Sequence, residues 1–273
     1  MNGVQLRAKL RLQASVAQVL ETATVRSAGP LPTVVASELA LCAPNIPPKP
    51  VLYLGRDLET QAIVSLITLK DKSAYIAILG APGIGKTSVA TAVLHAPDVV
   101  AAFGLHRFYV ACDAVGGRGS SLNALCAHFG ISEPNRGAAA KALCDILAEE
   151  RCLLVLDNFE SAWEAADNRA DAEETLGLLV TVKSLSLVIT MRGAERPQSV
   201  PWTRPLLPPH APLHDDAAKQ LFVAISDISE HNAHLAELLQ LLDNVPLPLV
   251  LTANIAQYEP SEELTVTRKS LPM

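Results

Sequence analysis

The spacing of apolar and polar positions divides the chain into three regions with different predicted structures. Apolar residues recur at helical spacing over 4–26 and again over 34–41, which predicts an amphipathic helix followed by a short one. The segment 43–50, APNIPPKP, is rich in proline and is typical of an extended linker. We therefore expect an N-terminal helical segment over 1–42 and a linker over 43–50.

The middle of the chain alternates short apolar runs with helical patterns. The apolar runs predict strands over 74–80, 106–111, 152–157 and 185–190. The patterns between them predict helices over 57–70, 86–95, 120–129, 137–149 and 172–183. Strands that are apolar throughout are buried on both faces, and their alternation with helices is typical of an α/β domain with a parallel sheet. We expect this domain over 51–204.

The last part of the chain has a helical pattern only. Apolar spacing predicts helices over 215–226, 232–243 and 247–257. We expect a partial helical subdomain over 205–258 and a divergent tail over 259–273.

Composition narrows the class of protein. Of the 273 residues, 49% are hydrophobic and 18% are charged, which excludes a disordered chain. The net charge of −6 disfavours a nucleic-acid partner, because such binding relies on neutralising phosphates. No apolar run is long enough to span a membrane, and the 5 cysteines form no C-x-x-C pair. We expect a cytoplasmic protein without a membrane partner.

A phosphate-binding loop follows the first predicted strand of the sheet. Gly80, Gly85, Lys86 and Thr87 satisfy the pattern G-x-x-x-x-G-K-[ST] between a predicted strand and a predicted helix. The glycines allow backbone N–H groups to point inward at phosphate oxygens, and the lysine reaches the terminal phosphates. The predicted phosphate-binding residues are Gly80, Ala81, Pro82, Gly83, Ile84, Gly85, Lys86, Thr87 and Ser88.

A carboxylate at the end of a buried strand completes a predicted magnesium site. Leu153–Asp157 reads as four apolar residues followed by an acid, which places Asp157 at the carboxyl edge of the sheet. The carboxylate and the Thr87 hydroxyl are both oxygen ligands, as Mg²⁺ prefers. We expect these two residues to hold the metal.

Two further positions at this edge bear on hydrolysis. The residue after Asp157 is Asn158, whose amide cannot accept a proton from water. Glu160 either replaces the missing acid or is a solvated loop residue, and the second interpretation is favoured. Arg192, at the end of the fourth strand, either contacts the γ-phosphate or pairs with Glu195 on the surface, and here the first is favoured.

The ordered set of motifs resembles the STAND class of P-loop NTPases of the NB-ARC/NACHT type, especially fungal proteins similar to NOD-like receptors. The loop over 80–88 is similar to its Walker A motif, 153–157 to its Walker B motif, and 190–192 to its sensor segment. The segment 206–222 is similar to the stretch that leads into the first helical subdomain of the family.

Two segments are similar to the adenine-binding elements of that family. Leu54-Gly55-Arg56-Asp57 resembles the short segment that precedes the first strand and contacts adenine, which implies that role for Gly55 and Arg56. Asn244–Leu247 stands where the family has G-L-P-L, and the resemblance implies that Pro246 packs on the base. It further implies ATP or ADP as ligand with Mg²⁺, a signalling switch as in innate immunity, and a homo-oligomer formed through the nucleotide-binding domain.

The chain departs from the family pattern in three ways. Asn244 replaces a glycine, Asn158 replaces the second acid, and the chain stops at Met273 before a winged-helix subdomain. The last departure suggests a fragment, an alternative product or a truncated gene model. His210, His214, His231 and His234 lack the spacing of a zinc pair.

Three functions follow from these residues. The first is a nucleotide-dependent switch with slow or absent ATP hydrolysis. The second is an active AAA-like ATPase, which needs Glu160 at the attacking water. The third is a non-enzymatic assembly scaffold with a vestigial nucleotide site.

Overall fold

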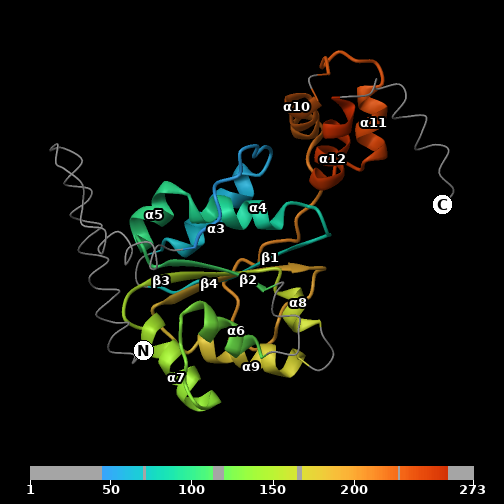
Figure 1. Ribbon diagram of the computed structural model, residues 1–273. Coiled ribbons are helices and arrows are strands. Elements are labelled where there is room, and N and C mark those ends of the chain that lie inside the picture. The colour runs from blue at the N-terminus through green and yellow to red at the C-terminus, as the bar shows by residue number, and fades with distance from the viewer. Residues whose placement is uncertain (1–44, 70–71, 113–119, 165–167, 227, 258–273) are drawn as a thin grey trace, which may run out of the picture.

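The computed structural model shows a parallel sheet with helices on both faces and a smaller helical unit beyond one edge (Figure 1). It describes residues 45–69, 72–112, 120–164, 168–226 and 228–257. The helices expected over 4–26 and 34–41 and the tail over 259–273 lie outside these residues.

The sheet confirms the four predicted strands and the α/β fold. Its strands are β1 (Tyr75–Gly80), β2 (Arg107–Ala111), β3 (Cys152–Asp157) and β4 (Leu185–Arg192). All neighbouring pairs are parallel, in the order β1-β4-β3-β2. Because parallel strands share one carboxyl edge, the ends of β1, β3 and β4 lie together, and a ligand crevice is expected at this edge.

The helices form a layer on each face of the sheet (Figure 1). One layer contains α3 (Asp57–Ile67), α4 (Lys86–Leu94) and α5 (Pro97–Phe103). The other contains α6 (Ser121–His128), α7 (Arg136–Leu147), α8 (Glu160–Trp163) and α9 (Arg169–Leu179). Each layer packs an aliphatic core against its own face of the strands, as an apolar sheet requires.

The helix boundaries differ from the prediction in several places. The sequence pattern missed α5 and α8, which are too short to show a helical period. Pro97 begins α5, where its missing N–H is not needed. The helix α3 ends at Ile67, before residue 70, and α9 is shifted toward the N-terminus relative to the predicted 172–183.

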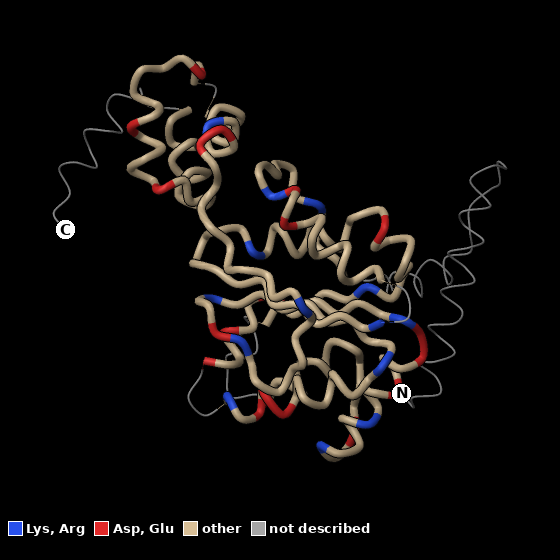
Figure 2. The backbone as a smooth tube through the Cα atoms, turned by 180° about the vertical axis from the view of Figure 1, so that it is seen from behind, with Lys and Arg blue, Asp and Glu red and all other residues tan. Residues whose placement is uncertain are grey.

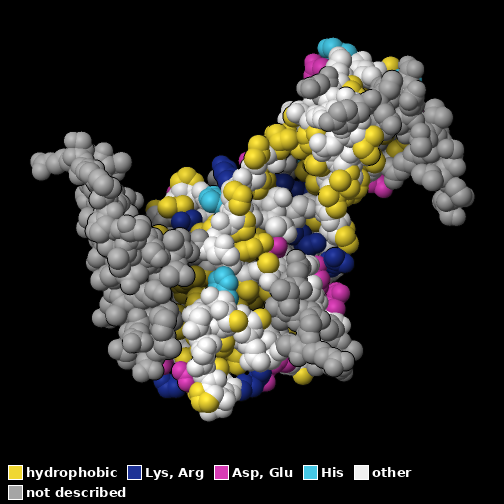
Figure 3. Space-filling model, in the orientation of Figure 1, with side chains coloured by type: hydrophobic (Ala, Val, Ile, Leu, Met, Phe, Trp, Pro, Cys, Tyr) yellow, Lys and Arg dark blue, Asp and Glu magenta, His cyan; other side chains and the backbone are white. Residues whose placement is uncertain are grey.

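The helical unit has a core of its own. It contains α10 (Asp215–Ser226), α11 (Leu235–Leu241) and α12 (Pro246–Ala256), whose buried side chains form a separate apolar cluster. Leu247, Leu251 and Ile255 remain about half exposed along α12, and hydrophobic side chains gather at the surface of this unit (Figure 3).

Charged residues of both signs are interspersed along the backbone in the described ranges (Figure 2). None of the helices within those ranges combines the length and the hydrophobicity that crossing a bilayer would require.

Candidate functional site

The loop between β1 and α4 has the backbone that the glycine pattern predicts. Gly83 and Gly85 have φ of 73° and 96°, in the left-handed region that glycine adopts without strain. Gly85 is the N-cap of α4, so the positive end of the helix dipole lies at the loop. The Lys86 Nζ donates hydrogen bonds to the carbonyl oxygens of Gly80 and Ala81, each at 3.0 Å. The ammonium is therefore held inside the loop, and burial lowers its pKa.

The carboxylate of Asp157 meets the loop as predicted. The Thr87 Oγ1 lies 3.0 Å from each of its carboxylate oxygens, although the two residues are 70 positions apart. The Tyr109 hydroxyl donates to Oδ2 at 2.8 Å, and the Thr190 hydroxyl donates to Oδ1 at 2.6 Å. Three hydroxyl groups on β2, β4 and α4 thus orient a single buried carboxylate.

The contacts of the Tyr109 and Thr190 hydroxyls with Asp157 were not predicted from the sequence. Both lie on the strands that flank β3, at or near their carboxyl ends, and Tyr109 pairs in register with Val155. Thr190 belongs to the segment 190–192 that resembles the sensor of the family, whereas Tyr109 lies in no motif, and the order of the strands is what brings both hydroxyls to Asp157.

The donors at this edge fit a magnesium ion. A carboxylate and a threonine hydroxyl are hard oxygen ligands, and Mg²⁺ is usually held by one or two carboxylates together with water and substrate phosphates. Within the described ranges, no group of three or more His, Cys, Asp and Glu residues could hold a metal by itself. Asp157 and Thr87 therefore suit a metal that arrives with a phosphate ligand rather than an all-protein cage.

Glu160 is buried, and the preferred interpretation of it as a solvated loop acid is wrong. It begins α8, which turns the side chain inward, and only 4% of the residue is exposed. The Glu160 Oε1 pairs with the Arg192 Nε at 3.0 Å, while Oε2 is buried without a hydrogen-bond partner among the described residues. Burial raises the pKa of this carboxyl, and the charges of Lys86 and Arg192 oppose the rise.

Arg192 lies at the carboxyl end of β4, and its ion-pair partner is Glu160 rather than Glu195. Glu195 pairs with Arg169, so the alternative Arg192–Glu195 pair does not form in the described part of the chain. The Arg192 side chain is 56% exposed even while it pairs with Glu160. It can therefore reach a ligand at the sheet edge without leaving a buried position.

Arg56 connects three segments around the loop. It is 5% exposed, pairs with Glu59 at 2.8 Å, and donates through Nη2 to the carbonyl oxygens of Ile84 at 3.1 Å and Ala211 at 2.6 Å. These bonds tie the start of α3 to the loop and to the segment before α10. The guanidinium is thus engaged in holding the loop.

Gly55 is required by packing as well as by backbone conformation. Its φ is 69°, and a Cβ at this position would lie 2.5 Å from the Cβ of Ala217 on α10. The backbone at the start of α3 therefore packs closely against the side chains of Ala217 and Leu213.

Pro246 lies beside the loop, as the resemblance implies. A Cβ on Gly85 would lie 3.9 Å from the Pro246 Cγ, and the Leu247 N–H donates to the Gly83 carbonyl oxygen at 3.1 Å. Asn244 has φ of 53°, and its side chain donates to Asp215 at 2.6 Å. Asparagine tolerates the left-handed conformation, so the turn survives the replacement of glycine.

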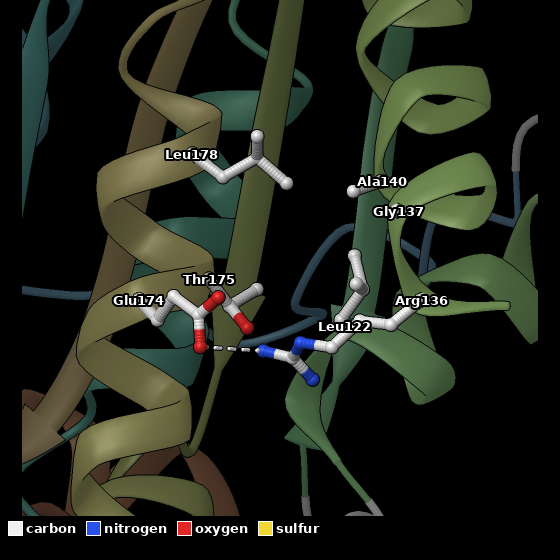
Figure 4. A pocket seen from close by; sticks show the side chains of 7 residues that line it. All are labelled: Leu122, Arg136, Gly137, Ala140, Glu174, Thr175 and Leu178. Atoms are coloured by element: carbon white, nitrogen blue, oxygen red, sulfur yellow. Dashed lines mark hydrogen bonds and ion pairs between the residues drawn. The ribbon is translucent and has the colours of Figure 1, made fainter.

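A hollow lies away from the loop, between α9 and the helices α6 and α7 (Figure 4). It has a volume of about 470 Å³, and the Arg136–Glu174 ion pair crosses it at 3.0 Å. The Thr175 hydroxyl is buried there with no hydrogen-bond partner among the described residues. The hollow contains none of the predicted site residues, so the loop remains the candidate site.

Comparisons with known proteins agree with this assignment. The sequence pattern of a family described as novel STAND NTPase 1 matches residues 48–207. No curated protein matches the chain. The fold is similar to the Walker-type ATPase of Pyrococcus abyssi, with 14% identity, a TM-score of 0.51, and coverage of 80% of this chain and 72% of that one. It is also similar to replication initiator DnaA bound to AMPPCP and single-stranded DNA, with 13% identity, a TM-score of 0.54, and coverage of 82% and 70%.

Structural likeness at this identity shows the fold alone, whereas the family pattern covers more than half of the chain. That pattern includes the phosphate loop, the Asp157 strand and Arg192. The chain therefore belongs to the novel STAND NTPase 1 family and is a nucleotide-binding P-loop NTPase.

Proposed function

We propose that the protein is a switch of the NB-ARC type that binds ATP and ADP with Mg²⁺ and hydrolyses ATP slowly or not at all. The observation that carries this proposal is the arrangement after Asp157. Asn158 donates its amide to the Ser161 hydroxyl at 3.2 Å, so it offers no base to a water molecule. Glu160, the nearest candidate acid, is paired with Arg192.

Different residues of the site would bind the phosphates, the metal and the base of the nucleotide. The loop amides, the α4 dipole and Lys86 suit the phosphates, which bear most of the negative charge of the ligand. When bound, Mg²⁺ would neutralise developing charge on the phosphates, and Asp157 and Thr87 would hold it. Arg192 would contact the terminal phosphate, which its exposure at the carboxyl end of β4 supports. Gly55, Arg56 and Pro246 would contact the adenine.

The rest of the proposal concerns the role in the cell. A switch of this class would act in cytoplasmic signal transduction, as in innate immunity, and would assemble into a homo-oligomer through the nucleotide-binding domain. We propose no nucleic-acid partner, because the net charge is −6, although the DnaA structure, at 13% identity, is one bound to single-stranded DNA.

The test is ligand-dependent stability. A ligand at 100 times its Kd stabilises a protein by about 2.7 kcal/mol, which raises the melting temperature by roughly 5–10 °C for a chain of this size. We expect this shift with Mg²⁺-ADP for the natural protein and for Lys183→Ala, an exposed lysine distant from the loop in sequence. Lys86→Ala should abolish it. Mass spectrometry of nucleotide released from purified protein should identify adenine, and the absence of both signals would refute the proposal.

An active AAA-like ATPase is the second candidate, and the burial of Glu160 favours it. The unpartnered Oε2 lies in a region influenced by Lys86 and Arg192, where a base could act on water. In that case Glu160→Gln would abolish measurable turnover, whereas a slow switch would keep its low rate. A scaffold with a vestigial site predicts instead that Lys86→Ala changes neither assembly nor ligand-dependent stability.

A further inference from the structure

His210 lies against the phosphate loop without belonging to the predicted site. Its backbone N–H donates to the Leu79 carbonyl oxygen at 2.7 Å, and it forms a parallel bridge with Gly80. A Cβ on Gly80 would lie 3.2 Å from the His210 carbonyl oxygen. The backbone of His210 is therefore held at the first glycine of the loop.

The register of this bridge determines which layer the imidazole enters. Residues paired across neighbouring strands direct their side chains to the same face of a sheet. Gly80 shares its face of β1 with Ile76 and Ile78, which pack in the same cluster as residues of α3 and α4. The imidazole therefore enters the layer of α3 and α4, where the charges of Arg56, Glu59 and Lys86 act on it.

The ring is neutral and one of its nitrogens has no partner. Burial, together with the charges of Arg56 and Lys86, lowers the pKa of His210 to about 4. A neutral imidazole has one donor and one acceptor nitrogen. Nε2 is buried and has no hydrogen-bond partner in the described part of the chain. An unpaired buried polar atom is unfavourable, so a partner at this position would be stabilising.

The nearby charged groups are already engaged with other partners. Arg56 bonds to Glu59 and to the carbonyl oxygens of Ile84 and Ala211, and Lys86 bonds to the carbonyl oxygens of the loop. The Arg56 Nε, like the His210 Nε2, is buried without a hydrogen-bond partner among the described residues, so this position has two polar atoms that a ligand group would satisfy. A neutral ring offers a directional hydrogen bond but no charge, which suits a base or a ribose hydroxyl better than a phosphate.

We propose that His210 Nε2 hydrogen-bonds the nucleoside part of the bound nucleotide and contributes to the choice of base. This inference rests on the proposed function, since it assumes that a nucleotide occupies the loop. The ring lies close enough to Arg56, at the start of α3, for the charge of the guanidinium to act on it. His210 is therefore a specificity residue, separate from the groups that bind phosphate.

The experiment compares ligands with and without a nucleoside on the full chain. Binding of Mg²⁺-ADP, Mg²⁺-GDP and Mg²⁺-pyrophosphate is measured by calorimetry for the natural protein, His210→Phe and His210→Gln. The phenylalanine keeps a ring without Nε2, and the glutamine restores a hydrogen-bonding amide. His231→Phe, at an exposed histidine, is the matched control.

We expect His210→Phe to weaken ADP binding about tenfold, the factor for one buried hydrogen bond, and to change the ratio of ADP to GDP affinity. Pyrophosphate binding should stay within about twofold, and His210→Gln should recover part of the loss. Equal weakening of ADP and pyrophosphate, or no weakening of either, overturns the role of His210. If the natural protein binds neither ligand, the proposed function itself fails, and this inference fails with it.

Discussion

Gly55→Ala is the substitution for which the structure gives the clearest expected cost. The residue has φ of 69°, and an added Cβ would lie 2.5 Å from the Ala217 Cβ and 3.3 Å from the Leu213 Cδ2. Holding alanine in the left-handed region costs about 1–2 kcal/mol. The contact with Ala217 adds about 1–3 kcal/mol of overpacking, because a Cβ cannot rotate away. We expect a total loss of about 2–5 kcal/mol in the free energy of unfolding.

A matched control separates the two contributions to this loss. Gly130 has φ of 66° and no atom within 4 Å of an added Cβ, so Gly130→Ala includes the backbone cost alone. Ala217→Gly removes the opposing Cβ at a cost of about 1 kcal/mol in α10. The effect of this change on stability should be about 1–3 kcal/mol more favourable in the Gly55→Ala background than in the natural protein, because neighbouring residues that share a contact are not additive.

The assay is urea unfolding followed by far-UV circular dichroism. The natural protein, the three single variants and the double variant Gly55→Ala/Ala217→Gly are compared, and their stabilities are taken at equal m-values. ADP binding is measured on the same samples, because Gly55 precedes the segment that holds the loop. A Gly55→Ala cost no larger than that of Gly130→Ala would refute the close contact between the start of α3 and α10. The contact would also be refuted if Ala217→Gly changed the free energy of unfolding equally in the Gly55→Ala background and in the natural protein.

Three further changes test other parts of the structure. Tyr109→Phe should raise the Mg²⁺ concentration needed to half-saturate ADP binding about tenfold, because Asp157 loses a hydroxyl that orients it. An unchanged midpoint in a magnesium titration would contradict this. Thr175→Val should raise stability by about 1 kcal/mol in urea unfolding, since it removes a buried hydroxyl without a described partner, and a loss of stability would show that the hydroxyl is paired. His210 should make the protein less stable as the pH falls from 6.5 toward 4, because its lowered pKa means that the unfolded chain binds the proton first. Allowing for the partial exposure of the ring, the loss is about 1–2 kcal/mol at pH 4.5, and His210→Phe should show a smaller loss in the same acid titration.

The meeting of Thr87 with Asp157 could be predicted because each residue belongs to a motif at the end of a buried parallel strand. The strands themselves were predictable for the same reason, since each is a near-continuous apolar run. Tyr109 was not predictable, because its role depends on β2 lying next to β3, and no local pattern states the order of strands in a sheet.

The burial of Glu160 could not be predicted from the sequence pattern either. Its burial depends on α8, a helix of 4 residues that no periodicity indicates. Asn244 shows the opposite case: its type departs from the glycine of the family, yet its φ of 53° preserves the turn. His210 became informative only when its backbone was found beside Gly80, 130 positions earlier in the chain.

The bond between the Leu247 N–H and the Gly83 carbonyl oxygen has a mechanical consequence. It attaches the first turn of α12 to the phosphate-binding loop. The helix ends at Ala256, nine residues or about 14 Å beyond that attachment. If the helix moves as a rigid body, a small rotation of the peptide unit at Gly83 produces a larger displacement at Ala256, the far end of the helix.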